Sequence, residues 1–368
     1  MGERSEHYGV LSAEEIGALI ATGVISGADP SRLQPASLDL TFSSRAWRVR
    51  ASFLPSRKRT VAERLDEGLA MREIDLSAGA VFERGCVYLV ELNERVALPG
   101  NLIGAANPKS STGRIDVFVR LVTDHGEAFD EIRAGYNGPL YAEVSPRSFS
   151  ILARAGSSLN QMRLKRGACR LSDDELAALN ETSPLVSVAN NRCDADIDGG
   201  LGLSVSLTKG DGDIIGWRAR AHTALIDVDK PGVLDRDDYF EAIGPQRSGF
   251  IILDPDEFYI LASKEALVIP PDTAAEMTPI SPGLGEFRVH YAGFFDPGFG
   301  WSEGKDGANG SRAVLEVRSH DAPFVLEDGQ LVARLVYEKM ASRPAALYGA
   351  DLKSNYQGQG LKLSKHFR

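Results

Sequence analysis

Asn107-Pro-Lys-Ser-Ser-Thr-Gly-Arg-Ile-Asp116 is followed by Val122-Thr-Asp-His125 and by Gly135-Tyr-Asn-Gly-Pro-Leu-Tyr-Ala-Glu-Val144. The centre of the first segment combines a lysine, three hydroxyls, a glycine and an arginine, which together suit phosphate oxygens. The segment lacks the spacing of a Walker loop and opens no long helical pattern, which disfavours a nucleoside-triphosphatase loop. Taken alone, it could also be a polar surface turn. The two segments after it favour an anion site.

Glu143 stands in the alternating run Pro-Leu-Tyr-Ala-Glu-Val, which predicts a β-strand. A glycine-rich hairpin precedes this run. A carboxylate on a strand is held by rigid backbone. The sequence therefore places a fixed acidic group after the phosphate-binding motif.

This order of motifs resembles the dCTP deaminases of the dUTPase-like superfamily. The resemblance implies that Ser110, Ser111 and Arg114 hold a triphosphate, with Lys109 where the family usually has arginine. It implies that Glu143 activates the attacking water.

The second motif of the resemblance is Val-Thr-x-His, and it implies substrate contacts for Thr123 and Asp124. His125 either positions the base or fills the end of the barrel. A single histidine beside a strand is more often structural, so both roles stay open.

The composition describes a globular protein of two domains. The chain has 368 residues, of which 43% are hydrophobic and 25% are charged, and its net charge is −10. This charge disfavours general binding to nucleic acid or to anionic membranes. A phosphate ligand would therefore meet a local cluster of positive charge.

The cysteines and the first residues bear on location. Cys86, Cys169 and Cys193 are far apart and form no C-x-x-C motif, which favours reduced thiols. Residues 1–7 show no apolar segment, and no run of about 18 apolar residues occurs. We expect a cytoplasmic protein that does not span a membrane.

An internal repeat is visible, with matching segments 160 to 170 residues apart. Leu11-Ser-Ala-Glu-Glu-Ile-Gly-Ala-Leu19 is matched by Leu171-Ser-Asp-Asp-Glu-Leu-Ala-Ala-Leu179, and each predicts a short helix with a capping box. Trp47-Arg-Val-Arg50 is matched by Trp217-Arg-Ala-Arg220. The pattern indicates one fold that occurs twice.

Many short alternating runs with glycine and proline between them predict an all-β chain with minor helices, jelly-roll-like in each half. The resemblance implies the same architecture. We expect two tandem dUTPase-like jelly-roll (β-clip) domains: residues 1–165 with the phosphate motif, and residues 166–368 with a C-terminal arm that closes over the nucleotide.

The two halves differ at their motifs. In place of the phosphate motif, the second half has Thr278-Pro-Ile-Ser-Pro-Gly283, without the cation and the paired serines. It keeps Ala292-Gly-Phe-Phe-Asp-Pro-Gly-Phe-Gly300 and Ala313-Val-Leu-Glu-Val317, which are closer to the family's Asp-Pro-Gly hairpin. Glu316 is therefore a second candidate for the catalytic carboxylate. Glu143 is preferred because it shares a half with the phosphate motif.

The segment from Tyr348 to Gln359 resembles the arm that closes over the nucleotide in dCTP deaminases. The resemblance implies that Tyr348, Lys353 and Gln359 contact the substrate. A disordered basic tail is the alternative.

Zinc deaminases carry H-x-E and P-C-x-x-C signatures, and this chain has neither. Its six histidines are scattered without the spacing of metal ligands. We expect no protein-bound metal and no zinc, a glutamate as general base, and Mg²⁺ brought by the nucleotide triphosphate.

The resemblance implies deamination of dCTP to dUTP and ammonia by a homotrimer, with dTTP or dUTP as possible further ligands. In the family, the phosphate motif of one subunit faces the hairpin of its neighbour. The rival arrangement pairs the phosphate motif of the first half with the hairpin and arm of the second half. Two other functions stay open: a bifunctional enzyme that goes on to dUMP, and a non-catalytic nucleotide-binding regulator.

Overall fold

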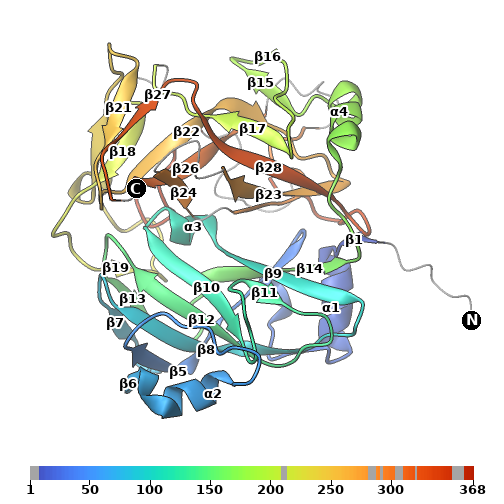
Figure 1. Cartoon of the computed structure of the whole chain (residues 1–368), viewed down its shortest axis with the longest axis vertical. Coiled ribbons are helices and arrows are strands. Elements are labelled where there is room, and N and C mark those ends of the chain that lie inside the picture. The colour runs from blue at the N-terminus through green and yellow to red at the C-terminus, as the bar shows by residue number, and fades with distance from the viewer. Residues whose placement is uncertain are drawn as a thin grey trace, which may run out of the picture.

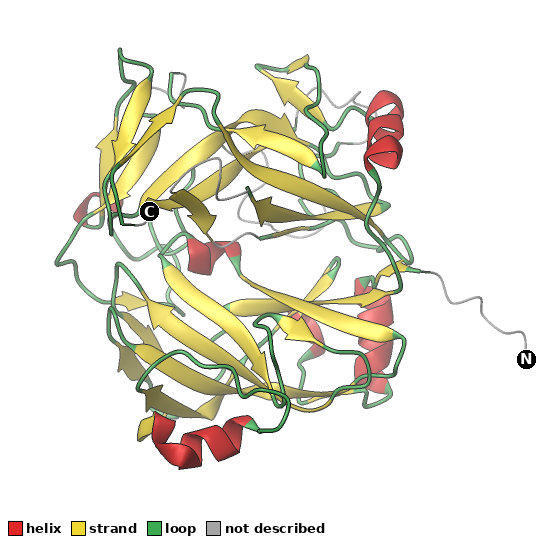
Figure 2. Ribbon diagram, in the orientation of Figure 1, coloured by secondary structure: helices red, strands yellow, loops and turns green. Residues whose placement is uncertain are grey.

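The computed structural model describes residues 8–208, 214–280, 287–290, 293–302, 310–319, 321–349 and 360–368. Figure 1 shows two halves, one from each part of the sequence, packed against each other with the short helix α3 (Ser110–Gly113) between them. Both halves consist mainly of strands, and the few helices lie at their margins (Figure 2). The prediction of a mostly-β chain with minor helices is confirmed.

The first half is built on two sheets that pack face to face. Within the described residues, one sheet has the order β11 (Glu131–Ile132), β9 (Leu102–Pro108), β14 (Asn160–Arg166), β4 (Ser37–Asp39) and β3 (Leu33–Gln34), with β1 (Gly9–Val10) beside β14. The other has the order β10 (Val117–Thr123), β12 (Asn137–Pro146), β8 (Val87–Ala97), β5 (Phe42–Val49) and β6 (Ala70–Asp75), with β2 (Ile25–Ser26) beside β8.

The second half has a larger sheet and a smaller one. The larger runs β16 (Asn191–Arg192), β15 (Val186–Val188), β22 (Tyr259–Leu267), β18 (Gly216–Ala219) and β20 (Phe240–Ile243), and β26 (Ser311–Ser319) pairs with both β22 and β24 (Phe287–His290). The smaller runs β17 (Leu201–Ser204), β28 (Leu331–Lys339), β23 (Thr273–Pro279) and β25 (Phe294–Phe295). A two-stranded ribbon, β21 (Phe250–Leu253) and β27 (Phe324–Glu327), flanks them.

The helices begin where the sequence predicts. Ser12 caps α1 (Ala13–Ala21) and Ser172 caps α4 (Asp173–Thr182), each in a capping box with the glutamate three residues on. The other helical segments are α2 (Val61–Arg64), the π-helical turn η2 (Leu65–Leu69), and the 3-10 turns η1 (Pro30–Arg32) and η3 (Arg236–Asp238). Of the helices that the structure describes, none has the length and apolar character that crossing a bilayer requires.

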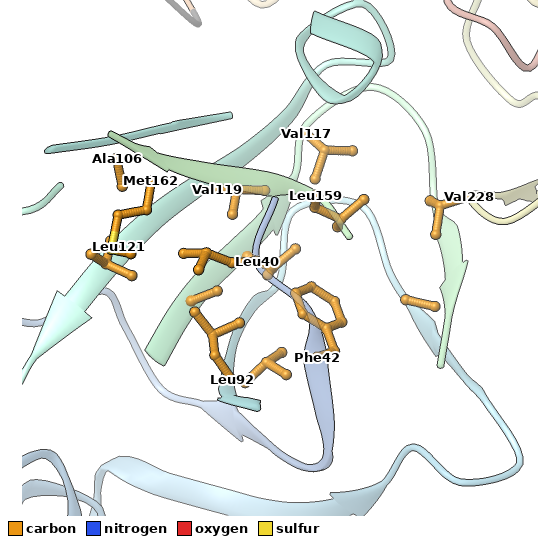
Figure 3. Close-up of a cluster of buried hydrophobic side chains, with 14 of the residues drawn as sticks. Leu40, Phe42, Leu92, Ala106, Val117, Val119, Leu121, Leu159, Met162 and Val228 are labelled. Atoms are coloured by element: carbon orange, nitrogen blue, oxygen red, sulfur yellow. The ribbon is translucent and has the colours of Figure 1, made fainter. Parts of the chain in front are cut away.

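The core of the first half includes side chains from the second. Val228 lies among residues such as Leu40, Phe42 and Leu159 of the first half (Figure 3). Beside it, β19 (Ile226–Asp227) pairs in parallel with β13 (Ile151–Ala153), which pairs on its other side with β7 (Ala80–Phe82). The halves are therefore joined through a shared apolar core and a shared sheet.

A polar layer also joins the halves. Arg163 on β14 is fully buried and donates hydrogen bonds to the Ala275 carbonyl at 3.0 Å and to Asp296 at 3.2 Å. Lys165 on the same strand pairs with Glu338 at 2.6 Å. Because buried charges need partners, these pairs restrict how the two halves can pack.

Candidate active site at the junction of the halves

The phosphate motif forms a single helical turn, α3, directly after β9. Its place is fixed by the Thr112 hydroxyl and the Lys109 amide, which both donate to the Leu159 carbonyl, at 2.8 and 2.9 Å. Ser111 and Arg114 are buried, each about 7% exposed, whereas Ser110 is exposed. The turn thus offers one solvent-facing hydroxyl above a rigid base.

Lys109 forms a salt bridge with Asp39 on β4 and lies 3.4 Å from the Ser158 hydroxyl. The Lys109 side chain is 20% exposed, so its ammonium group is held near the surface of the turn. Asp39 orients this cation.

Arg114 faces Glu316 of the second half. The Nε atom of Arg114 lies 3.8 Å from Oε1 of Glu316, and each side chain is 8% exposed. Burial raises the pKa of Glu316 to about 8, because the Arg114 charge only partly offsets the loss of solvent and Asp116 adds to the rise. A carboxyl group with this pKa can take up and release a proton near neutral pH.

Next to this pair, Asp116 and Arg318 form a second buried contact between the halves. Arg318 Nε lies 3.1 Å from each carboxylate oxygen of Asp116. Ser148 donates to Asp116 at 2.6 Å, and Arg318 donates to the Asp256 carbonyl at 2.7 Å. Arg114 of the first half therefore faces Glu316 of the second. Asp116 of the first half likewise faces Arg318, so each positive charge meets a negative one.

The last residues of the chain also reach the phosphate turn. The Lys362 carbonyl accepts from Arg114 at 2.9 Å, and Ser364 donates to the Ser111 carbonyl at 2.7 Å. His366 lies 2.9 Å from both the Ser364 hydroxyl and the Val228 carbonyl. Burial, followed by the nearby Lys109 charge, lowers the pKa of Lys365. The side chains of Lys109 and Lys365 therefore both lie near the turn.

Glu143 does not lie at the phosphate turn. On β12 it stands opposite Arg120 of β10, which binds it at 2.5 Å, and it is 4% exposed. Its neighbours Ala142 and Val144 face the core, so Glu143 lies on the outer face of the sheet. Within one chain the phosphate turn meets Glu316 instead of Glu143.

Thr123, Asp124 and His125 lie at the other end of β10 from α3, about 20 Å away along a strand of this length. The Asp124 carboxylate accepts from the Val61 amide at 2.8 Å at the start of α2. His125 has a positive φ of 59°, and its buried Nδ1 atom has no hydrogen-bond partner among the described residues. In the single chain these residues do not join the phosphate turn.

Tyr348 lies at the second-half hairpin. Its amide donates to the Pro297 carbonyl at 2.8 Å, and its ring packs 5.7 Å from that of Phe299. Lys353 and Gln359 lie outside the described residues.

Six residues were not identified from the sequence: Asp116, Arg318, Ser364, Lys365 and His366 at the junction of the halves, and Arg120 beside Glu143. A signal existed for two of them, because Arg114-Ile-Asp116 and Glu316-Val-Arg318 carry complementary charges at the same spacing. Within the described ranges, no three His, Cys, Asp or Glu side chains gather in a metal-binding group.

The fold and the site define a mostly-β protein in which a short turn rich in hydroxyl and basic side chains lies beside a buried carboxylate. Family models for the N-terminal and C-terminal domains of 2'-deoxycytidine 5'-triphosphate deaminase match residues 7–168 and 172–367. The chain belongs to this deaminase family, and the resemblance read from the sequence is confirmed.

A solved structure shows the same fold over nearly the whole chain. It is the crystal structure of 2'-deoxycytidine 5'-triphosphate deaminase from Agrobacterium tumefaciens, with 50% sequence identity and a TM-score of 0.85. The match covers 92% of this chain and 99% of that chain.

Curated relatives match over shorter stretches. A dCTP deaminase of Natronomonas pharaonis is 30% identical over 127 residues, which are 33% of this chain and 60% of that protein. A protein of Methanosphaera stadtmanae named "dCTP deaminase, dUMP-forming" is 32% identical over 137 residues, 36% of this chain and 64% of that protein. The chain thus spans about three fifths of the length of these curated relatives.

Proposed function

We propose that this protein hydrolyses dCTP to dUTP and ammonia, with Glu316 as the general base. The observation that carries the proposal is the buried Glu316 carboxyl group beside Arg114 of the phosphate turn, 3.8 Å away. Glu143 is the less favoured base, because Arg120 already holds its carboxylate on another face. Family membership supports the substrate.

In the proposed reaction, Glu316 takes a proton from a water molecule as the oxygen bonds to C4 of the cytosine. The carboxyl group passes this proton to N3, which gives a tetrahedral intermediate. A second proton, from the new hydroxyl, goes to the amino group, and the C–N bond breaks to release ammonia. The pKa of about 8 suits Glu316 for both directions of transfer. Arg114 would hold the carboxylate in place.

The triphosphate would lie on the phosphate turn. Ser110 is the exposed hydroxyl there, and Lys109 and Lys365 bring positive charge. The carboxylates described at the turn, Asp39, Asp116 and Glu316, already face the cations Lys109, Arg318 and Arg114. Mg²⁺ would therefore be held by phosphate oxygens and water, where it neutralises phosphate charge. Chelating Mg²⁺ should weaken dCTP binding, measured by calorimetry.

Ammonia release from dCTP tests the reaction. The wild-type protein should release one ammonia for each dUTP formed. Glu316→Gln should lower kcat by about 10²- to 10⁴-fold while dCTP still binds. Glu143→Gln is the matched control and should keep most of the rate. If the wild type binds dCTP without ammonia release, the protein is a regulator. If Glu143→Gln abolishes the rate, the base is Glu143.

Conversion through to dUMP is the second candidate, favoured by the name of the Methanosphaera relative. In the superfamily that reaction uses a hairpin aspartate, which here is Asp296. The Asp296 carboxylate is buried and bound by Arg163, which leaves it poorly placed to activate water. We therefore expect dUTP to accumulate without pyrophosphate, which a coupled pyrophosphate assay measures.

We also propose that the halves are two jelly-roll domains from one duplicated fold, divided near residue 165. Equivalent pairings support this: β14 lies between β9 and β4, as β28 lies between β23 and β17. A homotrimer in the cytoplasm follows from the family resemblance and the reduced cysteines. Sedimentation at micromolar concentration tests the trimer.

A further inference from the structure

The charges on the two sides of the site alternate in a way that the proposed reaction does not use. Arg114 and Asp116 come from the first half, and Glu316 and Arg318 from the second. Glu316 and Arg318 are two residues apart on β26, so their side chains share one face. The Asp116 and Arg318 pair thus lies directly beside the proposed base.

We propose that Asp116 and Arg318 are positioning residues, whose buried ion pair fixes α3 against β26 so that Arg114 and Glu316 face each other. The proposal rests on the proposed function of Glu316. Asp116 lies two residues after Arg114, the last residue of the motif to which the resemblance gives a role, and Arg318 follows the strand segment that ends at Val317. Asp116 is fully buried and Arg318 is 6% exposed, so their contact is held away from solvent.

The geometry of the pair restricts both partners. Arg318 meets the two oxygens of Asp116 through Nε at 3.1 Å, and its Nη2 atom lies 3.0 Å from the Ser148 hydroxyl. A planar guanidinium bound in this way fixes orientation as well as distance. Since Asp116 follows Arg114 by two residues, fixing Asp116 also fixes the end of the phosphate turn.

The pair also sets the charge around Glu316. The charges that act on this carboxyl group from the first half are those of Arg114 and Asp116. Arg318 lies two residues along on the same face of its own strand. The backbone of Glu316 pairs in register with Ile260 of β22 on one side and with residue His290 of β24 on the other. Loss of either charge of the pair should therefore shift the ionisation of Glu316, in opposite directions.

The test is a cycle of Asp116→Asn, Arg318→Gln and the double variant, with the pH profile of kcat/KM for dCTP as the readout. The acid midpoint is the pH at which kcat/KM reaches half its maximum on the acidic side. Asp116→Asn removes a negative charge, so this midpoint should fall by about one pH unit. Arg318→Gln removes a positive charge, so the midpoint should rise by a similar amount. The double variant should return near the wild-type midpoint with a lower kcat.

Two further variants test whether the effect comes from the orientation of the Arg318 guanidinium, from its charge, or from the contact between the halves. Arg318→Lys keeps the charge without the planar fork, so its midpoint should stay while kcat falls. Arg154→Gln breaks another contact between the halves, the pair with Asp227 at 2.8 Å, and should leave the midpoint unchanged.

Equal midpoints in all variants, or shifts of the same sign in both single variants, would overturn the proposal. The pH dependence of thermal unfolding, measured against Glu316→Gln, reports the same ionisation without turnover. In one outcome, the wild type releases no ammonia while the unfolding of Asp116→Asn and Arg318→Gln still shows opposite shifts in the ionisation of Glu316. That result would reject the proposed function and retain the positioning pair. Unfolding without those shifts would reject the pair. If Asp116→Asn does not fold, the double variant and Arg318→Lys carry the test.

Discussion

The guanidinium of Arg114 and the carboxyl group of Glu316 lie 3.8 Å apart, one from each half of the chain and both buried. Each half alone would expose its member of this pair to water and lose the environment that raises the pKa of Glu316. The site is therefore a property of the packed chain. Its pH dependence and its affinity for nucleotide can be tested residue by residue.

The stability of the protein should depend on Glu316 in a pH-dependent way. Burial raises its pKa to about 8, so between about pH 4.5 and pH 8 the folded protein keeps a proton that the unfolded chain releases. The contribution of Glu316 to the free energy of unfolding is therefore present at low pH and is lost as the pH rises through 8. Glu316→Gln should thus be more stable than wild type at pH 8.5, by a few kcal/mol, and about equal at pH 4.5.

Thermal unfolding across this pH range measures the effect. Glu143→Gln is the matched control, since it neutralises a buried strand glutamate of the other half. A stability difference for Glu316→Gln that does not change with pH would contradict this prediction.

Nucleotide affinity should depend on the phosphate turn. The double variant Arg114→Gln, Ser110→Ala removes one charged donor and one exposed hydroxyl. Losing a charge-assisted hydrogen bond costs about 1.5–3 kcal/mol, so dCTP binding should weaken by roughly ten- to a hundredfold. Calorimetric titration with dCTP measures this. Arg45→Gln, in an exposed pair with Glu73, should bind normally. Undiminished binding by the double variant would rule out the phosphate site.

The C-terminal segment should stabilise the turn through Ser364. Its hydroxyl donates to the buried Ser111 carbonyl at 2.7 Å, so Ser364→Ala should cost about 1–3 kcal/mol and raise KM for dCTP. The control is Ser187→Ala, because the buried Ser187 hydroxyl has no hydrogen-bond partner among the described residues. Urea unfolding and steady-state kinetics measure the two effects. Equal costs in both variants would show that Ser364 only fills space.

The buried pair of Arg163 with Asp296 should matter more than any exposed pair. Arg163→Met leaves the buried Asp296 without its cation, while Glu338 keeps Lys165, and this should cost about 3–5 kcal/mol. Adding Asp296→Asn removes one of these charges and should restore part of the loss. Urea unfolding of the single and double variants checks this. No recovery in the double variant would mean that Arg163 acts through its other contacts, such as the Ala275 carbonyl.

Much of the fold was predictable because its signals are local. The capping boxes at Ser12 and Ser172 place the starts of both longer helices to within two residues of the structure. The alternating runs around Trp47 and Glu143 fall in β5 and β12. Such signals depend on neighbours within a few residues, and these are fixed by the sequence.

The site was predictable in part. The phosphate motif forms a compact turn, and Glu143 and Glu316 both lie on strands. The contacts of Asp116 with Arg318 and of Ser364 with Ser111 were not foreseen. Both join residues that are far apart in the chain, and a charge or hydroxyl in sequence does not name its distant partner.

By itself, the sequence determined the family, the mostly-β character, the turn proposed to bind phosphate and the two candidate carboxylates. Only the tertiary structure decided that Glu316 meets the turn while Glu143 binds Arg120. The physical reason is that side chains alternate along a strand. The neighbours of each glutamate face a core, so both glutamates lie on outer faces of their sheets. Which outward face then meets the turn depends on how the halves pack, through the shared apolar core and the buried ion pairs.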